Sequence, residues 1–381
     1  MKKRLIILGI LLISIFSSCL IYIPEDGRRG PVYTERSYEP DYAERTSAVI
    51  SLSFIYDYLS GHGYWVRYRH YGYVWVPRRV PRHWRPYTYG RWVWTEYGWT
   101  WFSYFDWGWL PFHYGRWGWD VRLGWFWVPD TIWAPAWVIW RAGDIYVGWA
   151  PLPPEVEFVI GYGFRWRIRE LPHHYWVFIE VRRFGENRLL DWVIPPERNI
   201  TIINFTVVRD RISFKENKII NDALKPEEIE RWGRKPVTRV KLQEMKQPEP
   251  ARLSYSAMSL YKPEIKREQA VPKAVLEEAE AAERIKMEKQ VSSAVELDRI
   301  HRREEELLKK TQQLELENLK RKIEEESRSV TTEQKRKELD VKLQELKKKH
   351  EEEKKALIKR HQKEKQEKEK SVKKENLRKK G

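Results

Sequence analysis

The tryptophan-rich stretch in the first half of the chain constrains the fold more than any other feature. Of the 21 tryptophans among 381 residues, 20 lie between Trp65 and Trp192. Many stand in W-x-W pairs, and an extended strand places both rings of a pair on one face because its side chains alternate with a period of two. Turn-forming segments such as "EYG" and "DVRLG" separate the pairs. This spacing predicts a mainly β module, an antiparallel Trp-rich meander or small barrel-like sheet, over residues 64–150.

A weak internal repeat indicates two similar hairpins within this module. "GYVWVP" at residues 72–77 returns as "GWFWVP" at residues 124–129, and we expect the two copies to pair. Further along, "YWVFIEVRRF" and "ITIINFTVV" combine β-branched and aromatic residues. Such residues favour a pleated, half-buried surface, so we expect strands to continue over residues 156–208.

A change in composition divides the chain. No lysine occurs between Lys3 and Lys215, whereas the sequence beyond Lys215 is rich in Lys and Glu and poor in aromatic residues. We therefore interpret residues 47–215 as a Trp-rich β domain and residues 216–262 as a linker with one short helix in "KPEEIERWGRKP". Residues 263–381 are then a helical coiled-coil region with a charged tail.

The C-terminal region has the spacing of long helices. A seam with heptad spacing runs through six residues, of which two are polar and weaken it: Leu339, Leu343, Leu346, His350, Glu353 and Leu357. An earlier segment has a seven-residue series, and Thr331 with Gln334 forms a capping box at which a helix restarts. We predict two long helices, as an antiparallel hairpin or a bent rod, in a coiled coil with itself or a partner. A solvated charge run without a specific partner is the alternative.

The N-terminus has the pattern of an export signal. "MKKR" precedes an apolar run at Leu5–Phe16, and "FSSC" ends in the only cysteine of the chain. The pattern predicts a lipoprotein signal peptide at residues 1–18, lipidation of Cys19 and a tether at residues 19–46. An uncleaved anchor helix is the alternative. Both interpretations send the rest of the chain out of the cytoplasm.

These signals set expectations for location and partners. The residue after Cys19 is Leu20 rather than Asp, as in lipoproteins that are sent to the outer membrane. We therefore expect a lipid anchor in the cell envelope, in the outer membrane. The formal charge of +17 makes anionic envelope polymers candidate partners. Arginine interleaved with aromatic rings is also typical of single-stranded nucleic-acid binding, but export argues against a nucleic-acid partner.

The aromatic motifs resemble a known family. "YGYVWVP", "RPYTYGRWVWTEYGWTWFS", "WGWLPFHYGRW" and "GWFWVPDTIWAPAWVIWRAGDIYVGWAPLPP" are similar to those of exported Trp-rich bacterial proteins of unknown function. Some members are described as YXWGXW-repeat proteins, and some share a chain with a FecR domain. The resemblance covers about residues 52–240 and implies no catalytic activity. The literal YxWGxW spacing is not kept, since the corresponding segment here reads "YFDWGW".

The tryptophans can form a core or a binding face. A small sheet has little interior and Trp is rarely fully buried, so we expect a partly exposed aromatic face. Exposed rings would stack on sugars, which makes peptidoglycan or another envelope glycan the candidate ligand. Arginines among the rings are explained most simply by cation–π stacking. The candidate face comprises Trp92, Trp94, Trp99, Trp101, Trp107, Trp109, Trp117, Trp119, Arg91 and Arg116.

The sequence shows no pattern typical of an enzyme. No histidine pattern such as HExxH, no GxSxG and no phosphate loop occurs, so we expect no metal and no cofactor. A glycosidase needs two carboxylates facing each other across a cleft, and Asp106 with Asp120 is the one pair to consider. Both stand at turns, where Asp is common. We therefore expect a structural or binding role, with a glycoside-acting enzyme as a remote alternative.

Overall fold

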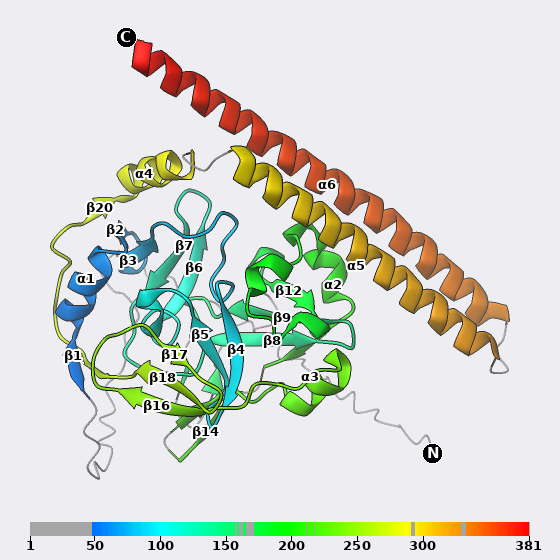
Figure 1. The fold of residues 1–381 in the computed structure, drawn as a ribbon, viewed down its shortest axis with the longest axis horizontal. Helices are drawn as coiled ribbons and strands as arrows, with labels where there is room; N and C mark the ends of the chain where they lie inside the picture. The colour runs from blue at the N-terminus through cyan, green and yellow to red at the C-terminus, as the bar shows by residue number, and fades with distance from the viewer. Residues whose placement is uncertain are drawn as a thin grey trace, which may run out of the picture. The chain divides into compact units, whose positions relative to one another are not determined.

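The computed structural model describes residues 48–156, 158–159, 163–164, 171–210, 212–216, 218–290, 294–328 and 333–380. The predicted signal peptide, Cys19 and the whole predicted tether lie outside the described residues, as does Thr331 of the predicted capping box. Within the described part, the N-terminal region consists mostly of antiparallel sheets and the C-terminal region of long helices (Figure 1). We call residues 48–290 the body and residues 294–380 the helical hairpin.

A five-stranded sheet contains both copies of the sequence repeat. Its strand order is β20-β2-β3-β7-β6. Strands β2 and β3 form one hairpin, β6 and β7 form another, and Trp75 of β3 lies opposite Trp127 of β7. The two repeat copies therefore pair as predicted. The strands are β2 (Gly63–Tyr68), β3 (Gly72–Pro77), β6 (Arg116–Asp120), β7 (Gly124–Val128) and β20 (Leu276–Glu277).

The central part of the body holds a four-stranded antiparallel sheet and a separate hairpin. The sheet has the order β12-β9-β8-β13, from β8 (Val138–Ala142), β9 (Tyr146–Pro151), β12 (Val177–Glu180) and β13 (Val207–Arg209). The hairpin joins β4 (Gly90–Thr95) to β5 (Gly98–Ser103). In its register, Trp92 lies opposite Trp101 and Trp94 opposite Trp99. The "TEYG" turn and its flanking strands thus form as the W-x-W spacing predicts.

Small sheets complete the body. They comprise β1 (Val49–Ser51) with β19 (Glu264–Lys266), β10 (Phe158–Val159) with β11 (Gly163–Phe164), β14 (Ser213–Lys215) with β15 (Lys218–Ile220), and β16 (Lys241–Met245) with β18 (Ala257–Tyr261) and β17 (Arg252–Leu253). Part of the predicted linker is therefore sheet. Two strands, β19 and β20, also precede the first helix of the region that we expected to be helical. Met258 and Leu260 explain this, because both are buried in the body's main apolar cluster.

Four helices belong to the body, along with several 3-10 turns. They are α1 (Leu52–Ser60), α2 (Asn199–Ile203), α3 (Pro226–Gly233) and α4 (Glu278–Gln290). Helix α3 confirms the prediction for "KPEEIERWGRKP". Helix α2 corrects the prediction for "ITIINFTVV", whose first half is not a strand. Pro196 opens the 3-10 turn η6 (Pro196–Arg198), and the chain continues from this turn directly into α2, burying Ile202.

Trp107 and Trp109 also depart from the predicted strand. They lie in the 3-10 turn η1 (Asp106–Trp109), which packs against β5. Gly108 permits this approach, because a Cβ at that position would collide with the side chain of Ser103. Both rings are nevertheless buried. The period-two rule fails here because a compact turn, rather than an extended strand, directs the two side chains.

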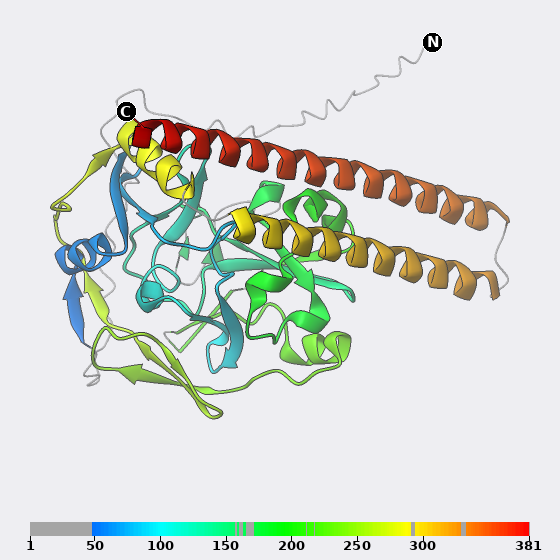
Figure 2. The same ribbon diagram turned by 45° about the horizontal axis from the view of Figure 1, so that its top comes forward.

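The helical hairpin consists of α5 (Ala294–Arg328) and α6 (Glu333–Lys380). Figures 1 and 2 show the two helices side by side. Near one end His301 of α5 contacts Glu364 of α6, and farther along α5 Glu315 contacts His350, so the helices are antiparallel. The structure thus has the hairpin rather than the bent rod.

Candidate functional site: the contact between body and hairpin

The rings of the predicted binding face lie mostly in the interior. Trp119 is 39% exposed and Trp94 is partly buried, whereas the other six rings are at most 4% exposed. Those six are Trp92, Trp99, Trp101, Trp107, Trp109 and Trp117. The expected partly exposed aromatic face is therefore wrong for most of its members.

The reason is that the Trp-bearing hairpin is covered on both sides. All six residues of β5 are buried, so neither face of that strand meets solvent. The ring of Trp92 packs against those of Trp101, Trp140 and Trp149, with centroids 4.9, 4.6 and 5.6 Å away. Such tilted and edge-to-face ring pairs stabilise the fold beyond the gain from burying their apolar area. Several small sheets packed together provide the interior that one small sheet lacks.

The two predicted arginines differ from each other. Arg116 is buried, and its guanidinium lies 3.5 Å from the ring centroid of Trp137, as the cation–π interpretation expects. Arg91 is partly buried and donates to the side chains of Asn187 and Thr238. Neither residue joins the exposed ring of Trp119 in one surface, so the structure does not assemble the ten candidates into a site.

The two carboxylates considered for a glycosidase have separate surroundings. Asp120 accepts hydrogen bonds from the backbone of Arg122 and Leu123, at 2.8 and 3.0 Å, and so closes the β6–β7 turn. Asp106 begins η1, and the hydroxyl of Tyr58 donates to its carbonyl oxygen at 3.3 Å. Within the described ranges, no group of three or more His, Cys, Asp or Glu residues could hold a metal ion. No helix in the same ranges is long and apolar enough to cross a membrane.

The densest polar chemistry lies where the hairpin meets the body. At its centre is Arg198 of η6, whose side chain is fully buried. Its guanidinium forms ion pairs with Glu315 of α5 and, at 2.6 Å, with Glu353 of α6. His350 of α6 contacts Glu315 at 2.7 Å. We call these four residues the arginine cluster.

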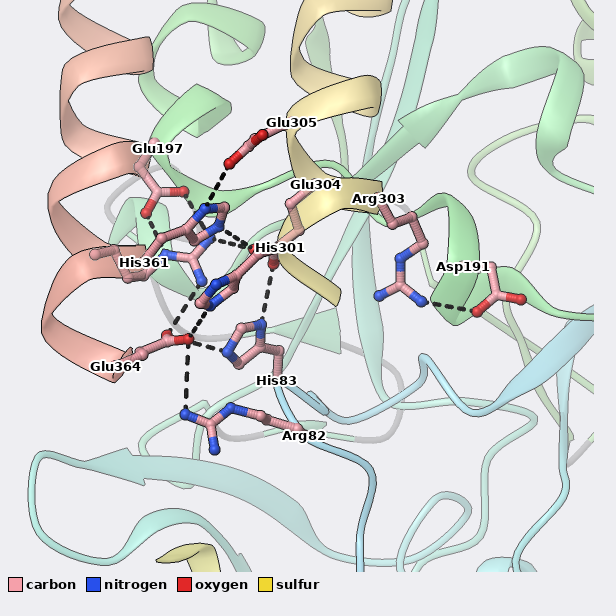
Figure 3. A network of polar contacts seen from close by, with 11 residues as sticks. Arg82, His83, Asp191, Glu197, His301, Arg303, Glu304, Glu305, His361 and Glu364 are labelled. Atoms are coloured by element: carbon pink, nitrogen blue, oxygen red, sulfur yellow. Dashed lines mark hydrogen bonds and ion pairs between the residues drawn. The ribbon is translucent and has the colours of Figure 1, made fainter. Parts of the chain in front are cut away.

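A second group lies nearby and is drawn in Figure 3. His83, on the loop between β3 and β4, has Nδ1 3.0 Å from Glu304 of α5 and Nε2 3.1 Å from Glu364 of α6. His361 of α6 faces Glu304 at 2.9 Å and Glu305 at 3.2 Å. The ring of His301 stacks on that of His361, with centroids 3.8 Å apart. We call these three histidines and three glutamates the histidine cluster.

Arginines connect the histidine cluster to the body. Arg360 of α6 forms ion pairs with Glu197 of η6 at 2.6 Å, and with Glu304 and Glu364 at 3.0 and 3.3 Å. Arg82 of the body lies 3.6 Å from Glu364. A third contact, Arg303 of α5 with Asp191 of the body, has a distance of 2.9 Å (Figure 3).

The apolar clusters of the body do not extend into the described residues of the hairpin. The two apolar clusters of the body contain residues from β1 to α4 but, among the described residues, none from α5 or α6. The leucines of the hairpin that are buried, such as Leu307, Leu339 and Leu357, lie outside both clusters. The contacts at and around the arginine and histidine clusters that join the hairpin to the body are those of charged and hydrogen-bonding side chains.

Opposite charges outweigh desolvation in these clusters. Burial alone would raise the pKa of Glu304, but hydrogen bonds from His361 and His83 outweigh it and hold that pKa well below its usual range. Burial would likewise lower the pKa of Arg198, but the negative charges of Glu315 and Glu353 raise it instead. For His301, burial does prevail and lowers its pKa despite the hydrogen bond to Glu364. Most of these side chains are thus charged in the folded protein.

The sequence contains one signal of this contact that the heptad interpretation passed over. The two polar residues in the predicted heptad seam, His350 and Glu353, are members of the arginine cluster. The segment "PPERN" at residues 195–199, between the two segments that we expected to be strands, supplies Glu197 and Arg198. A buried polar residue at a seam position often specifies which partner the helix meets. His350 and Glu353 could therefore have indicated that the two helices contact a third element of the chain.

Comparison with known proteins concerns only the Trp-rich part of the chain. No curated protein and no solved structure matches this sequence. A family model matches residues 56–156, which run from within α1 to just beyond β9 and carry most of the buried tryptophans. The hairpin and Arg198 lie outside the matched residues. Over residues 56–156, the chain is similar to a family of unknown function (DUF6600).

Proposed function

We propose that this protein is a non-catalytic, lipid-anchored component of the cell envelope in which the body carries the helical hairpin as a spacer or binding arm. The N-terminal sequence supports the anchor, through the apolar run and the lone Cys19. The single observation that supports the arm most strongly is the buried arginine cluster, because it fixes α5 and α6 to one side of the body by ion pairs from both helices.

The dimensions of the hairpin suit an arm. Helix α5 has 35 residues and α6 has 48. At about 1.5 Å per residue, these lengths correspond to roughly 50 and 70 Å. Glu315, which pairs with Arg198, is followed by a further 13 residues to the end of α5 at Arg328. We propose that this distal part is a coiled-coil segment that contacts an envelope partner or a second copy of the chain.

The interior position of the tryptophans favours a structural role for the body. Rings that are buried against one another stabilise a disulfide-free domain by apolar burial. A peptidoglycan-binding body would have to rely on Trp119, the one exposed ring of the predicted face. We therefore place the binding role on the hairpin and the anchoring role on Cys19.

The anchor is tested by a Cys19→Ser substitution in the full chain. We expect the natural protein to incorporate a labelled fatty acid and to sediment with membranes, because an acyl chain adds membrane affinity. The Cys19→Ser variant should lose the label, and Ser18→Ala is the matched control that keeps it. Absence of label from the natural protein would contradict the lipoprotein proposal, and sedimentation of both forms would then favour the uncleaved anchor helix.

A further inference from the structure

The histidine cluster places its rings between carboxylates in a way that requires protons. Both ring nitrogens of His83 face carboxylate oxygens, those of Glu304 and Glu364. Both ring nitrogens of His361 do the same, toward Glu305 and Glu304. An ionised carboxylate only accepts hydrogen bonds, so each of these nitrogens needs a hydrogen, and an imidazole with two N–H groups is a cation. The geometry therefore defines two imidazolium ions.

His301 differs from the other two histidines. Its Nε2 lies 2.8 Å from Glu364, whereas its Nδ1 is buried without a hydrogen-bond partner. One N–H satisfies this arrangement, so the ring is neutral. A neutral ring also suits its position, because it stacks on His361 at a centroid distance of 3.8 Å, where a second cation would be repelled.

Further charged side chains around the histidine cluster determine its net charge. Four carboxylates belong to it or border it: Glu197, Glu304, Glu305 and Glu364. The guanidiniums are those of Arg82 and Arg360, with buried Arg85 close enough to interact with Glu197 and Glu304. Asp298 interacts with His301, and Lys365 pairs with Asp298 at 3.0 Å. Without protons on the histidines, the carboxylates of the cluster outnumber the guanidiniums.

We propose that the histidine cluster is a proton-operated latch, which holds the helical hairpin on the body while His83 is protonated and releases it when His83 loses its proton. The latch joins three elements of the chain, the β3–β4 loop, α5 and α6, through the same two carboxylates. Loss of the proton from His83 turns a hydrogen bond into a contact between two acceptors, a ring nitrogen and a carboxylate oxygen. Release would free the polar faces of both helices for another partner.

The direction of the pH effect follows from His83. Burial would lower the pKa of His83, but its hydrogen bonds to Glu304 and Glu364 outweigh burial and raise this pKa above the ordinary value of about 6.5. A group whose pKa is raised in the docked state stabilises that state fully below its undocked pKa. This stabilisation is lost as the pH rises through the docked pKa, with a docking constant that falls up to about tenfold per pH unit for each proton released.

Other groups act at lower pH. The lowered pKa of His301 opposes docking only as the pH falls below about 6.5. The lowered pKa values of Glu304 and Glu364 mean that their contribution is lost only in strong acid, below the ordinary glutamate range. The interval from about pH 6.5 to about pH 9 therefore isolates the latch.

Hydroxyl-radical footprinting of the full chain tests the latch without an attached probe, because it oxidises side chains that become accessible to solvent. Tyr146 is fully buried, and its hydroxyl contacts the carbonyl of Thr311 on α5 and the side chain of Arg198. Trp140 is equally buried but lies within the aromatic core. Between about pH 6.5 and about pH 9 we expect oxidation of Tyr146 to increase at least about fivefold and that of Trp140 to stay constant. A constant rate at Tyr146 would overturn the proposal.

Two variants show whether the histidines are responsible. His83 has a φ of 59°, so His83→Asn retains a residue that tolerates left-handed backbone, and His361→Gln retains a good helix former. In the double variant we expect high oxidation of Tyr146 already at the lower pH, with no further rise. The matched control is His70→Asn on the exposed β2–β3 turn, which should behave like the natural protein. A double variant that keeps the natural pH dependence would show that other groups hold the hairpin.

Discussion

The body and the hairpin of this protein are held together by opposite kinds of interaction. Inside the body, aromatic side chains pack on one another, and 12 tryptophans are less than 2% exposed. Between the body and the hairpin, the contact consists of ion pairs and hydrogen bonds around Arg198, His83 and Glu304. Apolar burial depends little on pH or ionic strength, whereas charged contacts depend on both. One chain therefore combines a body held by aromatic packing with an attachment that contains buried charged side chains.

The two kinds of contact also fail differently. Removing part of an aromatic core leaves a cavity that the whole body feels. Removing one partner of a buried ion pair leaves an uncompensated charge, and here that charge would lie at the boundary of two parts. The first change should lower the stability of the body, and the second should loosen the hairpin while the body stays folded.

The largest effect is expected in the aromatic core. Trp140 is fully buried, contacts Trp92 and Trp149, and donates its indole N–H to Asn221 at 2.7 Å. Trp140→Ala should lower the free energy of unfolding of the body by about 3–5 kcal/mol, measured by urea denaturation. Trp119→Ala is the control, because that ring is 39% exposed. Trp119→Ala should change the free energy of unfolding by no more than about 0.5 kcal/mol, and equal losses in both variants would contradict the burial of Trp140.

The next effect concerns the attachment. Arg198→Met removes the cation between Glu315 and Glu353, and breaking a buried pair in this way costs about 3–5 kcal/mol. We expect Tyr146 to become reactive in footprinting at all pH values, while the urea midpoint of the body remains near its natural value. Arg252→Met is the control, since Arg252 also pairs with a carboxylate, that of Glu249, but its side chain is 69% exposed. A body that unfolds together with the hairpin would show that the two parts form one cooperative unit.

The smallest of the three effects concerns the stability of the body, which should fall as the pH falls, in the opposite direction to the latch. Burial lowers the pKa of His113, inside the body, to about 4. A histidine with a lowered pKa stabilises the folded state above its unfolded pKa, and this stability is lost as the pH falls from about 6.5 toward 4. The loss amounts to about 3 kcal/mol at most. The free energies of unfolding of the natural protein and of His113→Gln, measured by urea titration, should therefore converge as the pH falls. The latch, by contrast, should weaken as the pH rises. A constant difference between the two proteins at all pH values would count against a neutral His113.

Much of the local structure was predictable from the sequence. The W-x-W spacing and the "TEYG" turn predicted the β4–β5 hairpin, because strand periodicity and turn chemistry are local properties. The repeat at residues 72–77 and 124–129 predicted the pairing of β3 with β7, and the heptad spacing predicted two long helices. The predicted strands at Trp107–Trp109 and at "ITIINF" were wrong. Close packing at Gly108 placed the first segment in a 3-10 turn, and the turn that begins at Pro196 led the second segment into a helix, although these residues prefer strands.

Exposure and attachment could not be predicted in the same way. Whether Trp99 or Trp119 meets solvent depends on how the small sheets cover each other, and alternation within one strand says nothing about a second layer. Likewise, His83 is separated from Glu304 by 221 positions in the sequence. A charged residue on a helix is most often solvated, so only the approach of the β3–β4 loop and η6 reveals which carboxylates are buried.

The sequence by itself determined two parts of this protein, a tryptophan-rich β body and two long charged helices, and it supplies the pattern on which the proposed anchor at Cys19 rests. These follow from composition and from short-range periodicity, which a single chain displays openly. The tertiary structure alone decided that the tryptophans are core and that Arg198 and His83 attach the hairpin. The physical reason is that burial and the pairing of charges are properties of contacts between distant segments, and those contacts exist only after the chain has folded.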